Sequence, residues 1–134
     1  MNVTAVRNAL ADLLEDLGGQ ASAYVLAQPT PPGFQIPPPA PVHHYAMGQP
    51  GMSQWAFVVQ GFVALNNDIA AQMILDDWCA TSGTLSVIKA LEADKTLGGL
   101  VDNVVVTDQT PGRQVEQPPG NPMLLVEWHL TIYG

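Results

Sequence analysis

The sequence has few basic residues, one cysteine and no long apolar run. Its 134 residues include 4 Lys and Arg against 12 Asp and Glu, for a formal charge of -8. Proteins bind nucleic acids tightly by placing Lys and Arg against phosphates. Four scattered Lys and Arg residues therefore exclude sequence-specific nucleic-acid binding, although DNA could still slide past an acidic surface. The single cysteine, Cys79, excludes an internal disulfide and is typical of a reducing compartment.

Long apolar segments are also missing. The longest apolar runs have about five residues, as in Trp55–Val59, whereas a membrane-spanning helix needs about 20. The first 17 residues contain three acidic side chains and no uninterrupted apolar stretch, so we expect no signal peptide and a protein made in the cytoplasm. Charged residues make up 12% of the chain, about half of the usual share. Such a chain must either cover its surface with neutral polar groups or bury part of that surface against partners, including other copies of itself.

The apolar residues are spaced as in an α+β protein. From Val3 to Leu17 they recur at helical spacing, and either Asn2 or Thr4 is suited to cap that helix. Alternating or β-rich patterns predict strands at 21–27, 42–47, 54–65, 101–107 and 124–133. Two further helices are expected at 69–80 and 84–94, and 108–122 is expected to be a loop. The pattern predicts a single domain in which a mostly antiparallel, mixed β-sheet packs against an N-terminal helix and a central helix pair.

Prolines are concentrated in one segment. Seven of the 12 lie between Pro29 and Pro41. Proline lacks an N–H group and has a fixed φ, so we expect neither a helix nor a central strand here. Residues 28–41 are predicted to form an extended arm with Phe34 and Ile36 as isolated apolar side chains. Two interpretations stay open: a stiff surface loop, or an arm that lies on a neighbouring subunit.

No residue pattern predicts catalysis, and we expect no enzyme, metal or cofactor. Cys79 lies in a helical pattern with no Lys or Arg within four residues, which predicts a buried, inert thiol. Asp76 and Asp77 are consecutive, and consecutive residues diverge by about 100° around a helix. We interpret them as a solvated or interface face. Ser82, Thr84 and Ser86, near the start of the helix predicted over 84–94, are expected to be caps and not nucleophiles. His129 is expected to contact a neighbouring strand.

The second half of the chain has a recognisable order of motifs. Leu75-Asp76-Asp77 ends a helix, Ser82-Gly83 forms a turn, and a helix over 86–91 leads through Thr96-Leu97-Gly98-Gly99 to a valine-rich strand at 101–106. This order resembles the tail-terminator (tail-completion) proteins of phages with long non-contractile tails, particularly those of actinobacterial hosts. The first half agrees in layout, with a helix, a strand, the proline-bearing segment 36–40 and a long apolar strand.

The resemblance implies a structural virion protein at the head-proximal end of the tail. Such proteins form a hexameric ring that caps the tail tube, stops its polymerisation and offers a joining surface to the head connector, while DNA passes through the lumen. The implied partners are other copies of the chain, the tail-tube protein and the head–tail connector protein. The candidate subunit-interface residues are Phe34, Ile36, Pro38, Asp76 and Asp77.

Two alternatives stay open. The nearer one is another head–tail joining protein with a similar ring-forming fold, such as a connector stopper or a tail-tube protein. Tube subunits carry a long extended hairpin for which the sequence gives no indication. The more distant one is a small cytosolic ligand-binding domain or enzyme, which would require polar groups such as His44, Glu127 and His129 to converge.

Overall fold

Helices and strands follow one another in nearly the predicted order. The computed structural model describes residues 2–17, 20–25, 32–43, 54–64, 69–116 and 122–134. Its helices are α1 (Val3–Leu14), continued by the 3-10 turn η1 (Glu15–Leu17), α2 (Ile69–Cys79) and α3 (Val87–Leu91). Its strands are β1 (Gln20–Ser22), β2 (Gly33–Gln35), β3 (Ala40–His43), β4 (Gln54–Ala64), β5 (Asn103–Gln109), β6 (Arg113–Glu116) and β7 (Pro122–Tyr133).

Two long antiparallel strands form the centre of the sheet. β4 and β7 pair from Gln54↔Tyr133 to Ala64↔Met123. The short strands β2 and β3 follow one another along the other edge of β4, and β5 and β6 do the same along β7. β1 pairs in parallel with β2. The sheet is therefore mixed but mostly antiparallel, which confirms the predicted α+β class.

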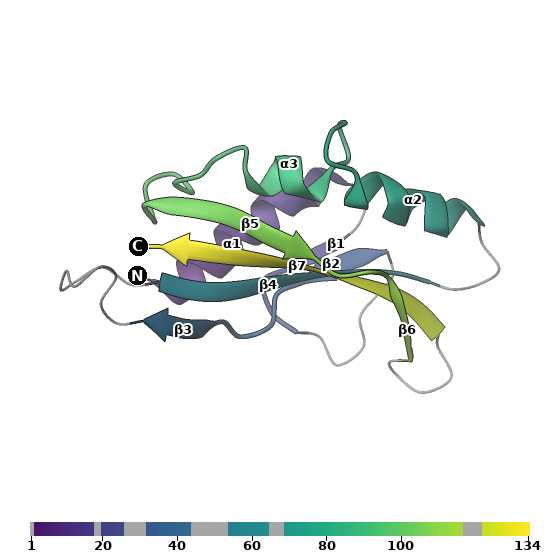
Figure 1. Ribbon diagram of the computed structural model, residues 1–134, viewed down its shortest axis with the longest axis horizontal. Coiled ribbons are helices and arrows are strands. Elements are labelled where there is room, and N and C mark those ends of the chain that lie inside the picture. Colours follow the sequence, from purple (N-terminus) through teal and green to yellow (C-terminus); the bar gives the residue numbers. More distant parts are fainter. Residues whose placement is uncertain (1, 18–19, 26–31, 44–53, 65–68, 117–121) are drawn as a thin grey trace.

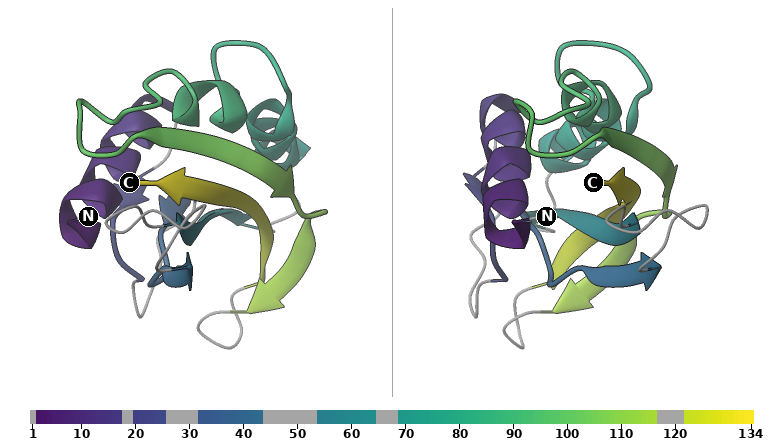
Figure 2. Two further views of the ribbon diagram at one scale, coloured as in Figure 1. Left: turned by 60° about the vertical axis from the view of Figure 1, so that its left-hand side comes forward. Right: turned by 90° about the vertical axis from the view of Figure 1, so that its left-hand side faces the viewer.

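All three helices cover the same face of this sheet, as Figures 1 and 2 show. Alternate residues of β4 and β7 point into the core below the helices, where Phe57 and Trp128 are completely buried beside Trp78 of α2. Gly61 makes room for the rings of Trp128 and Phe34. A Cβ at position 61 would lie 2.7 Å from Cζ3 of Trp128 and 3.2 Å from Cε1 of Phe34. The helices thus cover one face of the sheet, and none of the described helices lies on the opposite face.

Short polar contacts fix the ends of the helices. The Asn2 side chain accepts a hydrogen bond from the Ala5 N–H (3.1 Å) and caps α1. Ser86 caps α3, which is shorter than the predicted helix over 84–94. The Ser86 backbone is extended, so α3 begins only at Val87, and its hydroxyl accepts from the Lys89 N–H. After α3, the Asp94 carboxylate accepts from Thr96 and the Gly98 N–H, which lowers the pKa of Asp94.

The expectation that 28–41 contains no central strand is wrong. β2 lies inside the sheet, between β1 and β4. Its three residues, Gly33–Gln35, contain no proline, so their N–H groups are free to join the ladder. Pro41, by contrast, lies in β3, which pairs with β4 alone, where a missing N–H is tolerated. Residues 28–31 lie outside the described ranges.

The predicted loop over 108–122 also needs correction. β5 continues to Gln109, and β6 pairs with the first part of β7. Only one of the four residues of β6, Val115, is apolar, so alternation along this segment could not identify a strand. β1 ends at Ser22, so the described residues 23–25 of the strand predicted over 21–27 are not part of it. β3 begins before the strand predicted over 42–47. Residues 26–27 and 44–47 of these two predictions lie outside the described ranges.

Candidate functional site

The outer side of α2 is partly apolar. Trp78 points into the core, and about half a turn around the helix Ile69 and Met73 are 73% and 60% exposed. Asp76 follows on the same stripe, and Asp77 is exposed beside it. We call these four residues, Ile69, Met73, Asp76 and Asp77, the α2 face. The sequence indicated the two aspartates as a solvated or interface face, but Ile69 and Met73 were missed, although their i, i+4 spacing opposite Trp78 was a signal.

Among the described residues, the carboxylates of the α2 face form no ion pair. Both ion pairs found among the described residues, Arg113–Glu127 and His129–Asp108, involve other acids. The pKa of Cys79 is raised, first by burial and then by the negative charge of Asp76. The surface of α2 is therefore negatively charged next to an exposed apolar pair.

The raised pKa of Cys79 leads to a prediction. The thiol is half-buried, and the protonated form dominates at neutral pH, so we expect iodoacetamide to alkylate native Cys79 much more slowly than the same chain in urea. Because a raised pKa favours folding below the pKa of the unfolded thiol, this stabilisation should be lost as pH rises above about 9. Equal alkylation rates in native and unfolded chains would show that Cys79 is an accessible, reactive thiol.

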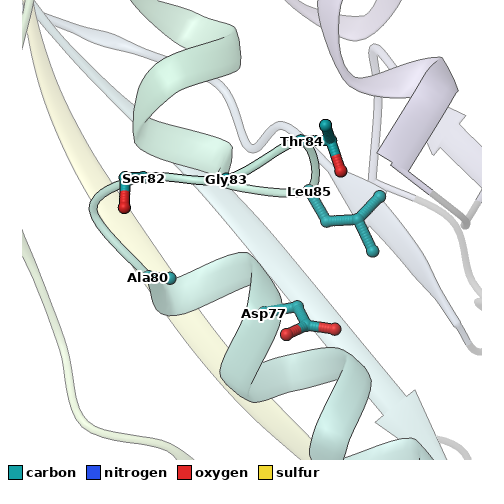
Figure 3. A pocket seen from close by; sticks show the side chains of 6 residues that line it. All are labelled: Asp77, Ala80, Ser82, Gly83, Thr84 and Leu85. Carbon is teal, nitrogen blue, oxygen red and sulfur yellow. The ribbon is translucent and has the colours of Figure 1, made fainter.

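A shallow pocket follows the C-terminal end of α2. Figure 3 shows Asp77 on the helix and Ser82 and Thr84 in the loop after it. Its volume of about 220 Å³ lies below the roughly 300 Å³ at which small-molecule pockets begin. Ser86, the next hydroxyl along the chain, donates to the Ala80 carbonyl at 2.5 Å and caps α3, which confirms its predicted role as a cap.

A polar row crosses the opposite face of the sheet. Gln35, Gln60 and Glu127 are register partners on β2, β4 and β7. The Gln35 Nε2 donates to Gln60 Oε1 (2.8 Å), and the Gln60 Nε2 donates to Glu127 Oε2 (2.9 Å). Arg113 of β6 completes the row with an Nη2–Oε1 distance of 3.6 Å to Glu127. The Glu127 side chain is 18% exposed and the Arg113 side chain 60%, so the row ends in an accessible guanidinium.

A second pocket lies beside this row, and its lining combines apolar side chains with polar ones of the row. Phe62, Met123 and Leu125 form a small buried cluster separate from the main core, and Val115 packs against it. The pocket has a volume of about 190 Å³ and includes Arg113 in its wall. We call it the sheet pocket, and it is lined by Gln35, Gln60, Phe62, Arg113, Val115, Met123 and Leu125. No sequence pattern predicted it, because its walls come from strands far apart in the chain.

The histidine that the structure describes in full is His129. It is the register partner of Asp108, and its Nδ1 lies 2.6 Å from Asp108 Oδ1, which confirms the predicted cross-strand contact. Glu127 lies two residues away on the same face but contacts Gln60 and Arg113 instead. His44, the third member of the group considered for a ligand site, lies outside the described residues. Within the described ranges, no three His, Cys, Asp or Glu side chains are grouped as a metal site requires.

The predicted interface residues fall into two groups. Phe34 and Ile36 are 1% and 0% exposed in the core of this same chain. The expectation that they dock on a neighbouring subunit is therefore corrected: they belong to the chain's own packing because Phe34 lies in β2 and Ile36 directly follows it. Pro38 is exposed between β2 and β3, and Asp76 and Asp77 are exposed on α2. For these three residues an interface role stays a prediction.

Comparisons with known proteins do not assign the chain to a family. No protein-family model matches it, and no curated protein has a significantly similar sequence. None of the helices in the described ranges has the length and apolar character needed to cross a membrane.

Proposed function

We propose that the chain is a phage tail-terminator protein, whose copies form a ring that caps the tail tube and joins it to the head connector. The observation that carries this proposal is the α2 face, which exposes Ile69 and Met73 at 73% and 60% in a chain with a net charge of -8. Large exposed apolar side chains on adjacent turns are typical of interaction surfaces. The segment that resembles terminators begins at about Ala70, so it includes most of α2.

The remaining chemistry is compatible with a structural role. Capping a polymer end is a binding task and requires no catalytic group. The excess of acidic residues would repel DNA phosphates, which suits a subunit that surrounds a passing genome. A small domain with few charged residues is suited to burying much of its surface against neighbours.

A tube-polymerisation assay tests this function. The tail-tube protein encoded by the same phage genome is polymerised alone, with the chain, or with an unrelated acidic protein of similar size, and tube lengths are measured by electron microscopy. We expect shorter tubes and additional density at tube ends only when the chain is present. Unchanged lengths with no bound chain would contradict the proposal. Unchanged lengths together with binding to the connector protein would instead support a stopper.

A further inference from the structure

We propose that the α2 face of one copy docks into the sheet pocket of the next copy. In this contact Met73 fills the pocket, and Asp76 or Asp77 pairs with Arg113. The inference rests on the proposed function, because it assigns the two surfaces that would join neighbouring subunits of the ring.

The two surfaces lie on opposite sides of the molecule. α2 packs on the helix-covered face, whereas Phe62 and Leu125 alternate with core residues and point to the other face. Figure 1 accordingly places α2 and β6 on opposite sides of the central strands. The α2 face and the sheet pocket of one chain therefore cannot meet each other. A contact between them joins two copies head to tail, and such contacts form a closed ring when the rotation between copies completes a circle.

The size of the sheet pocket suits one side chain. Its volume of about 190 Å³ exceeds the roughly 30 Å³ that a water molecule occupies and falls short of the roughly 300 Å³ of small-molecule sites. Methionine is unbranched and flexible, so it fills irregular apolar spaces well. Met73 is 60% exposed on α2. Burying its side chain would remove apolar surface from water, which favours association.

The charges of the two surfaces are also complementary. The chain has four bases, and Arg7 is engaged internally, because it donates to the Ala23 and Ile36 carbonyls at 2.8 and 2.7 Å. Lys89 and Lys95 lie near Glu92 and Asp94 in sequence, and neither lines the sheet pocket. Arg113 alone among the described bases borders the sheet pocket. Its guanidinium has five N–H donors, so its long contact with Glu127 leaves donors for a second carboxylate.

A charge-exchange experiment tests this contact. Asp76→Lys/Asp77→Lys and Arg113→Glu are made separately and together, and the dissociation constant of the oligomer is measured by sedimentation. We expect each change alone to weaken association at least tenfold and the combination to restore it to within about threefold. Asp12→Lys, an exposed acid-to-base change on α1, is the matched control and should leave association unchanged. Circular dichroism verifies that each variant is folded.

A disulfide test checks the geometry independently. In a Cys79→Ala background, Met73→Cys and Val115→Cys are combined, and we expect oxidation to link one copy to the next. Both tests are repeated on chain bound to tail tubes. If oligomers or caps form but no disulfide joins neighbouring copies, the docking inference is overturned and the proposed function stands. The same holds if the combined charge exchange fails to restore association. A chain that neither self-associates nor caps tubes would overturn both.

Discussion

Phe34→Ala is expected to lower the free energy of unfolding by about 3–5 kcal/mol. The Phe34 side chain is 1% exposed. Its ring centroid lies 4.3 Å from that of Trp78 and 6.3 Å from that of Trp128. Removing the ring would leave a cavity between β2, α2 and β7 that these packed neighbours can fill only in part. Urea denaturation followed by tryptophan fluorescence measures the change.

Pro38→Ala is the matched control for this prediction. Pro38 lies in the same proline-rich segment but is exposed. Its replacement should lower the free energy of unfolding by less than about 1 kcal/mol, mainly because alanine gives the unfolded chain more conformational freedom. A similar small loss for both variants would show that 33–36 lies outside the core. That result would restore the interpretation of this segment as an arm that docks on a neighbouring subunit.

Trp78→Ala is expected to lower the free energy of unfolding by a similar amount, about 3–5 kcal/mol. Trp78 is completely buried, and its Nε1 donates a 2.7 Å hydrogen bond to the Leu17 carbonyl. This bond connects α2 to η1 at the end of the first helix. The alanine variant loses both the packing of the ring and the hydrogen bond, and it leaves the Leu17 carbonyl without this partner.

Trp78→Phe separates the two contributions. It keeps an aromatic ring against Phe34 but removes the indole N–H. We therefore expect the free energy of unfolding to fall by about 1–3 kcal/mol, because the Leu17 carbonyl loses this partner and some packing is lost. Gln72→Ala, an exposed change on the same helix, should remain within about 0.5 kcal/mol of the original chain. If Trp78→Ala cost no more than Gln72→Ala, the packing of α2 on the sheet would be contradicted.

The long elements could be predicted from the sequence because their patterns are long. β7 alternates from Val126 to Tyr133, with Trp128, Leu130 and Ile132 buried and the residues between them partly exposed. The short β2 could not be predicted, since three proline-free residues among prolines carry too little pattern. Its place inside the sheet depends on tertiary pairing with β4. Gly61 gave no sequence signal either, because its role depends on rings that arrive from β2 and β7.

The surfaces could be predicted only in part. Asp76 and Asp77 were expected on a solvated or interface face, and both are exposed. The sheet pocket, however, combines residues of β2, β4, β6 and β7, and only the register of those strands brings them together. Phe34 and Ile36 illustrate the reverse case. Isolated apolar residues among prolines suggest docking on a partner, yet the same chain buries them in its own core.

The mass of the assembled chain tests the central claim of a self-associated ring most directly. The mass of the free chain is measured by light scattering across a concentration and salt series. Chain bound to tail tubes is cross-linked and released, and the mass of the cross-linked species is then measured. We expect a single closed species at a whole-number multiple of 14.3 kDa, six-fold for a hexamer, in at least one of these states. A monomer at every concentration, together with single chains recovered from tubes, would contradict the ring.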